Sequence, residues 1–150
     1  MTATAHRAAA PATGRRRAGY LVGAGVNAVL LYLVNVSPGW EAVPFLTGRT
    51  PEVLPLVNAS LLAGVLANLV YAVRDPRWLV LLGDVVTTSI GLAAVLRVWD
   101  VFPLDFEAGA WETVARVLLV IGAVGSVLGI VVALVRLANP ATRTGRGRPR

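Results

Sequence analysis

Four long apolar stretches, separated by short polar segments, run through the chain. Their boundaries are the charged residues Arg17 and Glu41, Glu52 and Arg74, Arg77 and Arg97, and Arg116 and Arg136. Asp84, in the third stretch, is the one charged residue inside them. A helix needs about 20 mostly apolar residues to cross a hydrocarbon core of about 30 Å, and continuous apolar runs in lipid favour helices. The pattern predicts an all-α fold, a four-helix transmembrane bundle with spans at about 18–37, 53–73, 78–98 and 113–137.

Basic residues divide unevenly between the two ends of these spans. One end would carry Arg7, Arg15, Arg16, Arg17, Arg74, Arg77, Arg136, Arg143, Arg146, Arg148 and Arg150, with Asp75 as its acid. The other would carry Arg49 and Arg97, with Glu41, Glu52, Asp100, Asp105, Glu107 and Glu112. Because cytoplasmic loops are enriched in Arg and Lys, the first end is predicted to be cytoplasmic. We expect a multi-pass protein of the plasma (inner) membrane with cytoplasmic N and C termini.

The composition agrees with a membrane protein and excludes several kinds of chemistry. Hydrophobic residues make up 56% of the 150 residues and charged residues 15%, whereas soluble domains average about 25% charged residues. There is no Cys, and the single His, His6, lies in the polar N-terminal segment. Disulfides, thiolate metal sites and His-based catalytic sets are therefore excluded, and no phosphate-binding or dinucleotide-binding glycine motif is present. We expect no enzyme, no cofactor and no metal site.

Both ends of the chain are polar and basic. Residues 1–17 and 138–150 cannot bury a core, so they are predicted to be disordered cytoplasmic tails around a membrane domain of residues 18–137. The net charge of +6 raises nucleic-acid binding as an alternative, but the charge flanks apolar segments, so the lipid bilayer is the expected partner and nucleic acid is not. A cleaved signal peptide is an alternative for the first span; its apolar run is too long, and no A-x-A-like site follows.

The two predicted outer connections share a short motif. Residues 40–45 and 99–104 both fit Trp-[Glu/Asp]-x-x-Pro-apolar. Two related helical hairpins in tandem would explain the match, as in membrane proteins with internal repeats. Chance is the alternative, because Trp at the membrane interface and Pro in loops are both common.

Polar residues inside the spans are the strongest functional candidates, since an intramembrane acid must face protein or a water cavity. Asp84 lies about 10 Å into the membrane, counted from Arg77 at about 1.5 Å per residue. The predicted cluster in the cytoplasmic half consists of Asn27, Asn68, Asp84, Thr87 and Thr88. Helix packing, a proton, ion or substrate pathway, and a partner-subunit contact all remain open interpretations. If these residues serve helix packing, Asp84 is expected to form an ion pair with Arg74 or Arg136.

A second polar layer is predicted near the outer side. It consists of Asn35, Asn58, Arg97 and Arg116. The two Arg side chains are expected either to extend toward the headgroups or to pair with the nearby acids Asp100, Asp105 or Glu112.

Small residues recur on one face of three spans. They are Gly19, Gly23 and Asn27 in the first, Ser60, Gly64 and Asn68 in the second, and Gly122, Ser126, Gly129 and Ala133 in the fourth. Such faces let helices approach closely. Because the Asn residues continue these faces, their side chains are expected to point into the bundle rather than at lipid.

Two segments carry a resemblance to known proteins. They are residues 35–45, with the sequence Asn-Val-Ser-Pro-Gly-Trp-Glu-Ala-Val-Pro-Phe, and residues 74–78, with the sequence Arg-Asp-Pro-Arg-Trp. They resemble a group of uncharacterised small four-span inner-membrane proteins of high-GC Gram-positive bacteria, over about residues 18–137. The resemblance implies a bacterial inner-membrane protein and supplies no activity or site residue.

The sequence favours two functions over an intramembrane enzyme. The first is a structural or accessory subunit of a membrane assembly, as a homo-oligomer or with another membrane protein. The alternative is a small oligomeric transporter or channel in which Asp84 is the intramembrane coupling acid.

Overall fold

The computed structural model describes residues 12–106 and 109–139. Four long helices account for most of them: α1 (Ala12–Asn35), α2 (Leu54–Val73), α3 (Arg77–Val101) and α4 (Gly109–Ala138). Two short 3-10 helices, η1 (Trp40–Ala42) and η2 (Thr50–Glu52), lie in the connection between α1 and α2. Each long helix is long and apolar enough to cross a membrane. The predicted all-α fold with four membrane-spanning helices is confirmed, and the chain is a multi-pass membrane protein.

The helix boundaries follow local signals in the sequence. Pro76 precedes the first residue of α3, so the Asp-Pro step ends α2 at Val73 and restarts the chain as α3. Helix α3 ends at Val101, and the residue after it, Phe102, adopts a left-handed conformation with φ 42°. The prediction that the N-terminal tail is disordered up to residue 17 is wrong for residues 12–17, which form the start of α1; Arg15, Arg16 and Arg17 are good helix formers and outweigh Thr13 and Gly14. The remaining tail residues, 1–11 and 140–150, lie outside the described part of the chain.

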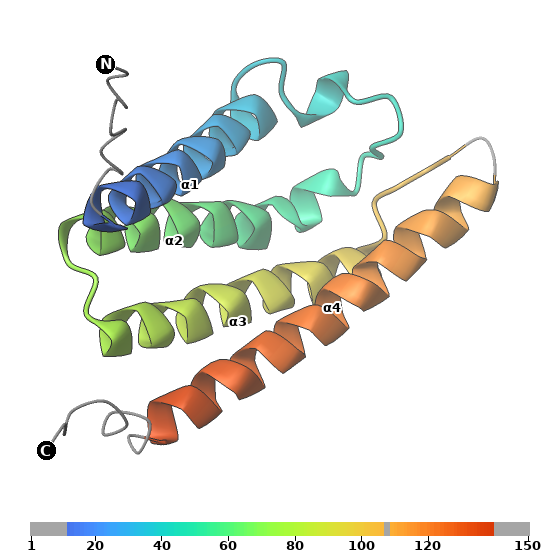
Figure 1. Cartoon of the computed structure of the whole chain (residues 1–150). Coiled ribbons are helices and arrows are strands. Elements are labelled where there is room, and N and C mark those ends of the chain that lie inside the picture. Colours follow the sequence, from blue (N-terminus) through green and yellow to red (C-terminus); the bar gives the residue numbers. More distant parts are fainter. Residues whose placement is uncertain (1–11, 107–108, 140–150) are drawn as a thin grey trace, which may run out of the picture.

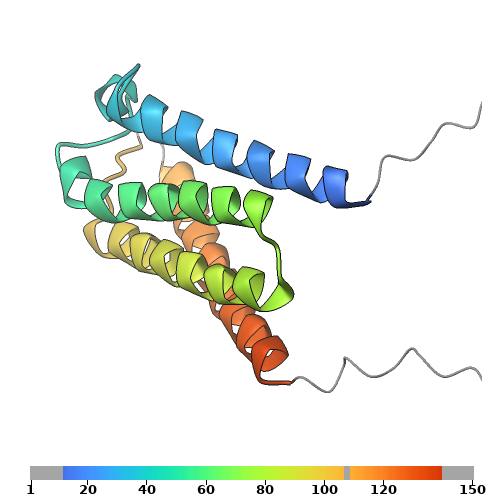
Figure 2. The same cartoon turned by 90° about the vertical axis from the view of Figure 1, so that its left-hand side faces the viewer.

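The helices form an open row rather than a closed ring. Helix α1 packs on α2, α2 on α3, and α3 on α4, while no comparable packing joins α1 to α4. Figures 1 and 2 show α1 and α4 at opposite edges of this row. Successive helices are antiparallel, so α1/α2 and α3/α4 are consecutive hairpins. If the two hairpins were related by a two-fold axis, α4 would pack on α1 in the same way as α2 packs on α3. The structure lacks this symmetry. A common origin of the two hairpins remains a prediction.

The two ends of the row differ in how they are covered. The loop end carries the connections 36–53 and 102–106, and the turn end carries the short 74–76 turn. At the loop end the two connections pair: the Thr47 amide donates to the Pro103 carbonyl (3.0 Å) and the Asp105 amide to the Phe45 carbonyl (2.9 Å). Among the described residues, the lowest exposures belong to this cap and the adjoining helix ends, including Val101 at 2% and Thr50 at 3%.

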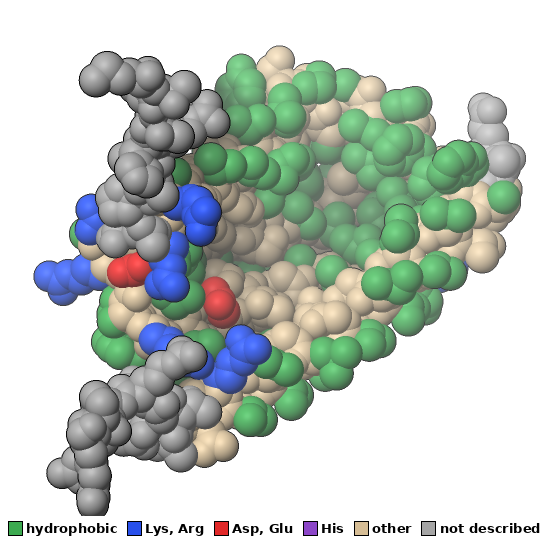
Figure 3. Space-filling view, viewed as in Figure 1, with side chains coloured by type: hydrophobic (Ala, Val, Ile, Leu, Met, Phe, Trp, Pro, Cys, Tyr) green, Lys and Arg blue, Asp and Glu red, His purple; other side chains and the backbone are tan. Residues whose placement is uncertain are grey.

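Apolar side chains cover most of the outer surface of the helices. Within each candidate span only 6% of the residues are buried inside the protein. Figure 3 shows hydrophobic side chains spread over the body of the molecule, with Arg side chains gathered at one end. This surface would be unstable in water but suits lipid, because acyl chains solvate it without cost.

Candidate functional site: polar groups within the spans

Helices α1 and α2 are joined by two reciprocal Asn–Gly contacts. The Asn27 side chain lies against Gly64, with its Oδ1 2.8 Å from where a Cβ on Gly64 would stand. The Asn68 side chain occupies the same position over Gly23, also at 2.8 Å. Each Asn amide nitrogen donates to the carbonyl four residues earlier on its own helix, at 2.8 Å. Both Asn side chains therefore face the partner helix, as the small-residue faces predict.

The same interface continues to the loop end through a third pair. The Asn35 Nδ2 donates to Asn58 Oδ1 at 2.9 Å, and the Asn58 Nδ2 donates back to Asn35 Oδ1 at 2.7 Å. Asn35 Nδ2 also donates to the Leu31 carbonyl. Reciprocal amide hydrogen bonds form in only one register of the two helices. This pair therefore helps set the position of α1 along α2.

Asp84 is held by a tyrosine on the neighbouring helix. The Tyr71 hydroxyl lies 3.1 Å from the Val80 carbonyl and 3.4 Å from Asp84 Oδ1. It can reach them because Gly83 has no side chain: a Cβ there would collide with the hydroxyl. The Tyr71 ring is buried, at 6% exposure, and packs edge-on against Tyr20 of α1. Tyr71 thus connects α1, α2 and α3 near the turn end.

The five residues of the predicted inner cluster do not share one hydrogen-bond network. Asn27 and Asn68 belong to the α1/α2 interface, and Asp84 belongs to the α2/α3 interface. Thr87 Oγ1 donates to the Gly83 carbonyl of its own helix (2.9 Å), and no hydrogen bond of the Thr88 side chain occurs among the described residues. The structure therefore divides this cluster between the α1/α2 interface, the α2/α3 interface and the two Thr residues of α3.

The predicted ion pair of Asp84 with Arg74 or Arg136 is wrong. Within residues 12–106 and 109–139, Asp84 forms no salt bridge. The physical reason is the Gly83 slot, which brings the Tyr71 hydroxyl to the carboxylate while both Arg residues lie at the helix ends. Asp84 is nonetheless an exposed residue on a membrane-spanning helix.

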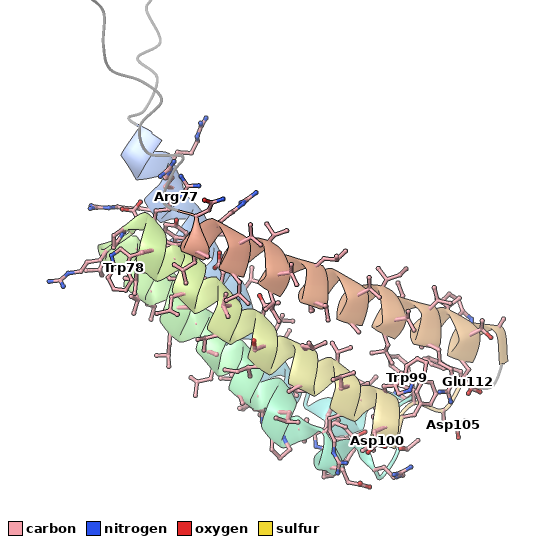
Figure 4. The ribbon with its side chains drawn as sticks, turned by 90° about the horizontal axis from the view of Figure 1, so that it is seen from below. Arg77, Trp78, Trp99, Asp100, Asp105 and Glu112 are labelled. Atoms are coloured by element: carbon pink, nitrogen blue, oxygen red, sulfur yellow. The ribbon has the colours of Figure 1, made fainter. Side chains whose placement is uncertain are left out.

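The two Arg residues of the predicted outer layer are paired, as expected. Arg97 bridges Asp100 at 3.0 Å and Glu52 at 3.7 Å. Arg116 bridges Glu112 at 2.9 Å, and its guanidinium carbon lies 4.0 Å from the Phe102 ring centroid. Figure 4 shows Asp100 and Glu112 at the loop end, opposite Arg77 at the turn end. Asp105, the third expected partner, forms no salt bridge with a described residue.

This arrangement offers an acid and amides but no assembled reaction centre. Among the residues described, no group of three His, Cys, Asp or Glu is placed to hold a metal ion. The Asn amides are engaged with backbone carbonyls or with one another, which is the geometry of helix packing. Asp84 is the remaining candidate for chemistry, because it is an exposed acid whose carboxylate contacts one phenol hydroxyl.

Sequence reasoning missed Tyr71, Gly83 and the pairing of the two loops. Tyr71 follows Asn68 by three residues and so lies on the same face of its helix, and Gly83 adjoins Asp84. These signals place each residue on a face, but the contact between them depends on how α2 packs against α3.

Comparisons with known proteins add nothing to this picture. No family model matches the chain, and no curated protein or solved structure shows significant similarity to it. The resemblance to four-span proteins of high-GC bacteria remains an expectation.

Proposed function

We propose that this protein is a subunit of a membrane assembly, in which a partner completes the open row of helices. One observation carries the proposal: Asp84, inside a membrane-spanning helix, is exposed and lacks an ion pair among the described residues. A charged side chain costs about 3 kcal/mol at the centre of a spanning helix on insertion scales, and less toward its ends, where Asp84 lies. A partner that offers Asp84 a hydrogen-bond donor or a positive charge lowers this cost.

Unused glycines support the same proposal. Gly125 and Gly129 form a GxxxG pair on α4, both are exposed, and no other side chain lies within 4 Å of where their Cβ atoms would stand. Glycine in a helix interior costs about 0.5–1 kcal/mol relative to alanine. GxxxG faces favour close helix–helix contact in membranes, and this one is not used within the chain.

The orientation of the protein in the membrane is proposed from the distribution of its Arg residues. The described Arg residues of the turn end, where α1 starts and α4 ends, are Arg15, Arg16, Arg17, Arg74, Arg77 and Arg136. By the positive-inside rule this end is cytoplasmic, in a bacterial inner membrane if the sequence resemblance holds.

The test is the oligomeric state of the full chain in lipid nanodiscs and mild detergent, measured by native mass spectrometry. We expect a complex of at least two copies, or of one copy with another membrane protein. Asp84→Leu should separate it, while the matched control Ser89→Leu, at another exposed polar position of α3, should not. Two results together would refute the proposal: the protein is a strict monomer with no copurifying protein, and Asp84→Leu makes this monomer more stable because it removes a lipid-exposed charge.

A small oligomeric transporter is the second candidate, favoured by the same exposed Asp84, which lacks an ion pair among the described residues. Four helices in an open row do not enclose a pathway, so transport also requires oligomerisation. Proton and monovalent-cation flux into proteoliposomes should fall to the level of protein-free vesicles in Asp84→Asn and persist in the control Ser89→Ala. Flux that is unchanged in Asp84→Asn removes Asp84 from the transport mechanism.

A further inference from the structure

A cavity of about 360 Å³ lies at the loop end, beneath the two paired connections. Its walls come from the ends of α1, α2 and α3 and from both loops, represented by Leu33, Val57, Val98, Leu46 and Leu104. Figure 3 shows the corresponding hollow, lined by hydrophobic side chains, in the half of the molecule away from the Arg cluster.

The cavity wall offers almost no polar group to a ligand. Thr50 and Trp40 are the lining residues whose side chains carry a polar atom, and the Thr50 hydroxyl already donates to the Thr47 carbonyl at 2.7 Å. An apolar cavity of about 150 Å³ stays dry and binds benzene, and this cavity is larger. Its volume falls within the range of about 300–1,000 Å³ typical of ligand sites. Its chemistry therefore selects a hydrocarbon ligand over water or a polar metabolite.

The roof of the cavity is fixed in place. Leu46 and Leu104 form an isolated antiparallel bridge, flanked by the Thr47–Pro103 and Asp105–Phe45 backbone hydrogen bonds. The Phe45 and Phe106 rings stack with centroids 5.4 Å apart. These contacts hold the two loops together across the helix ends, so the cavity does not depend on a bound partner to keep its shape.

The position of the cavity identifies its occupant. Val98 and Thr50, two of its lining residues, directly follow Arg97 and Arg49 in the sequence. Glu52 joins these two Arg residues, at 3.7 Å from Arg97 and 3.2 Å from Arg49. Charged side chains of this kind lie at headgroup level, and interfacial Trp residues such as Trp40 on the cavity rim lie there too.

The cavity is thus placed at the boundary between headgroups and hydrocarbon, where lipid acyl chains are the abundant apolar molecules. We propose that it binds one acyl chain of a phospholipid from the leaflet at the loop end. This site is independent of the subunit proposal, which concerns Asp84 and α4.

The test uses the full chain in vesicles of phosphatidylethanolamine and phosphatidylglycerol that contain a phospholipid with a diazirine near the end of one acyl chain. After photolysis, mass spectrometry should find adducts concentrated in the cavity-lining segments 33–57 and 98–104. Val57→Trp, which fills the cavity, should lose these adducts. The control Val124→Trp, at a position of α4 that is 53% exposed, should keep them.

Two further measurements test acyl-chain binding even if Val57→Trp fails to fold. Val98→Phe fills the opposite wall and should also lose the adducts, and a probe with its diazirine on the headgroup should not label the lining residues. Adducts spread evenly over the exposed faces of the helices would overturn the proposal. Lining residues without lipid adducts, in a chain that native mass spectrometry finds as a dimer in the same vesicles, would overturn it in favour of a second copy.

Discussion

The α1/α2 and α3/α4 hairpins both carry glycines, but among the described residues only the first hairpin fills any of them with side chains from its own opposite helix. At the α1/α2 interface, Gly23 and Gly64 each receive an Asn side chain from the opposite helix. On α4, Ala133 is buried and Ser126 is half-buried, whereas the half-buried Gly122 has no other side chain within 4 Å of its missing Cβ. The first hairpin is therefore held by side chains that fit its glycines, whereas the second packs without using Gly122.

This difference shows that a face of small residues does not by itself determine where two helices make close contact. A glycine permits close approach, but the contact forms only where the partner helix presents a side chain that fits the space. The α2/α3 interface confirms the point, because Gly83 has a matching side chain in Tyr71. Glycine substitutions should therefore have effects that depend on the neighbour and not on the glycine itself.

The largest effect is expected for Gly83→Ala. The new methyl group collides with the Tyr71 hydroxyl, and the buried ring packed on Tyr20 has little room to move, so we expect a loss of about 2–3 kcal/mol in the free energy of unfolding. Far-UV circular dichroism during titration of mixed micelles with SDS measures this loss. Tyr71→Phe removes the colliding oxygen and should restore part of the stability in the double variant. Wild-type stability of Gly83→Ala would contradict the proposed Tyr71 slot.

A smaller effect is expected for Gly64→Ala, which displaces the Asn27 amide. Because the end of an Asn side chain can rotate away, we expect a loss of about 1–2 kcal/mol. In a double-mutant cycle with Asn27→Ala, the second substitution should remove most of the cost, since the two residues are in contact. Additive effects, measured by the same SDS titration, would argue against the contact. Gly23→Ala with Asn68→Ala is the matched second cycle.

A still smaller effect is expected when the amide pair near the loop end is replaced. Asn35→Leu with Asn58→Leu exchanges two interhelical hydrogen bonds for apolar contact, and such bonds average about 0.6 kcal/mol each in membranes. We expect a loss of about 1 kcal/mol. Either single variant should cost at least as much as the double, because it leaves one unpaired amide. A single variant as stable as the wild type would show that the pair does not contribute to stability.

The smallest effect, with the opposite sign, is expected for Gly122→Ala. A methyl group there meets no other side chain within 4 Å, so the helix-propensity gain of about 0.5 kcal/mol remains. Thermal unfolding in detergent, followed by Trp fluorescence, should show a small increase in Tm. A loss of stability comparable to that of Gly64→Ala would mean that the glycines of both hairpins are in close contact with the opposite helix.

Several features of the fold could be predicted because their causes are local. Long apolar stretches bounded by charged residues predicted the four helices, and the Asp75-Pro76 step marks the boundary between α2 and α3. The Arg97–Asp100 and Arg116–Glu112 pairs are three and four residues apart on one helix, so helical geometry alone brings them together. The inward direction of Asn27 and Asn68 followed from the spacing of four to Gly23 and Gly64.

The partner of Asp84 could not be predicted in the same way. Charge alone suggested Arg74 or Arg136, whereas Tyr71 reaches the carboxylate because α2 and α3 pack with Gly83 facing it. Which of several polar groups meets an intramembrane acid depends on the rotation and register of neighbouring helices, and apolar patterning specifies neither.

By itself, the sequence determined that this chain crosses a membrane four times as helices, because lipid leaves no other way to satisfy a long apolar backbone. It also placed the Asn residues on the packing faces of the first two helices. Only the tertiary structure decided that the helices form an open row, that the two loops pair above an apolar cavity, and that Asp84 is left exposed beside Tyr71. These features arise from contacts between helices that are distant in sequence, and in lipid such contacts depend on the fit of side chains rather than on hydrophobicity.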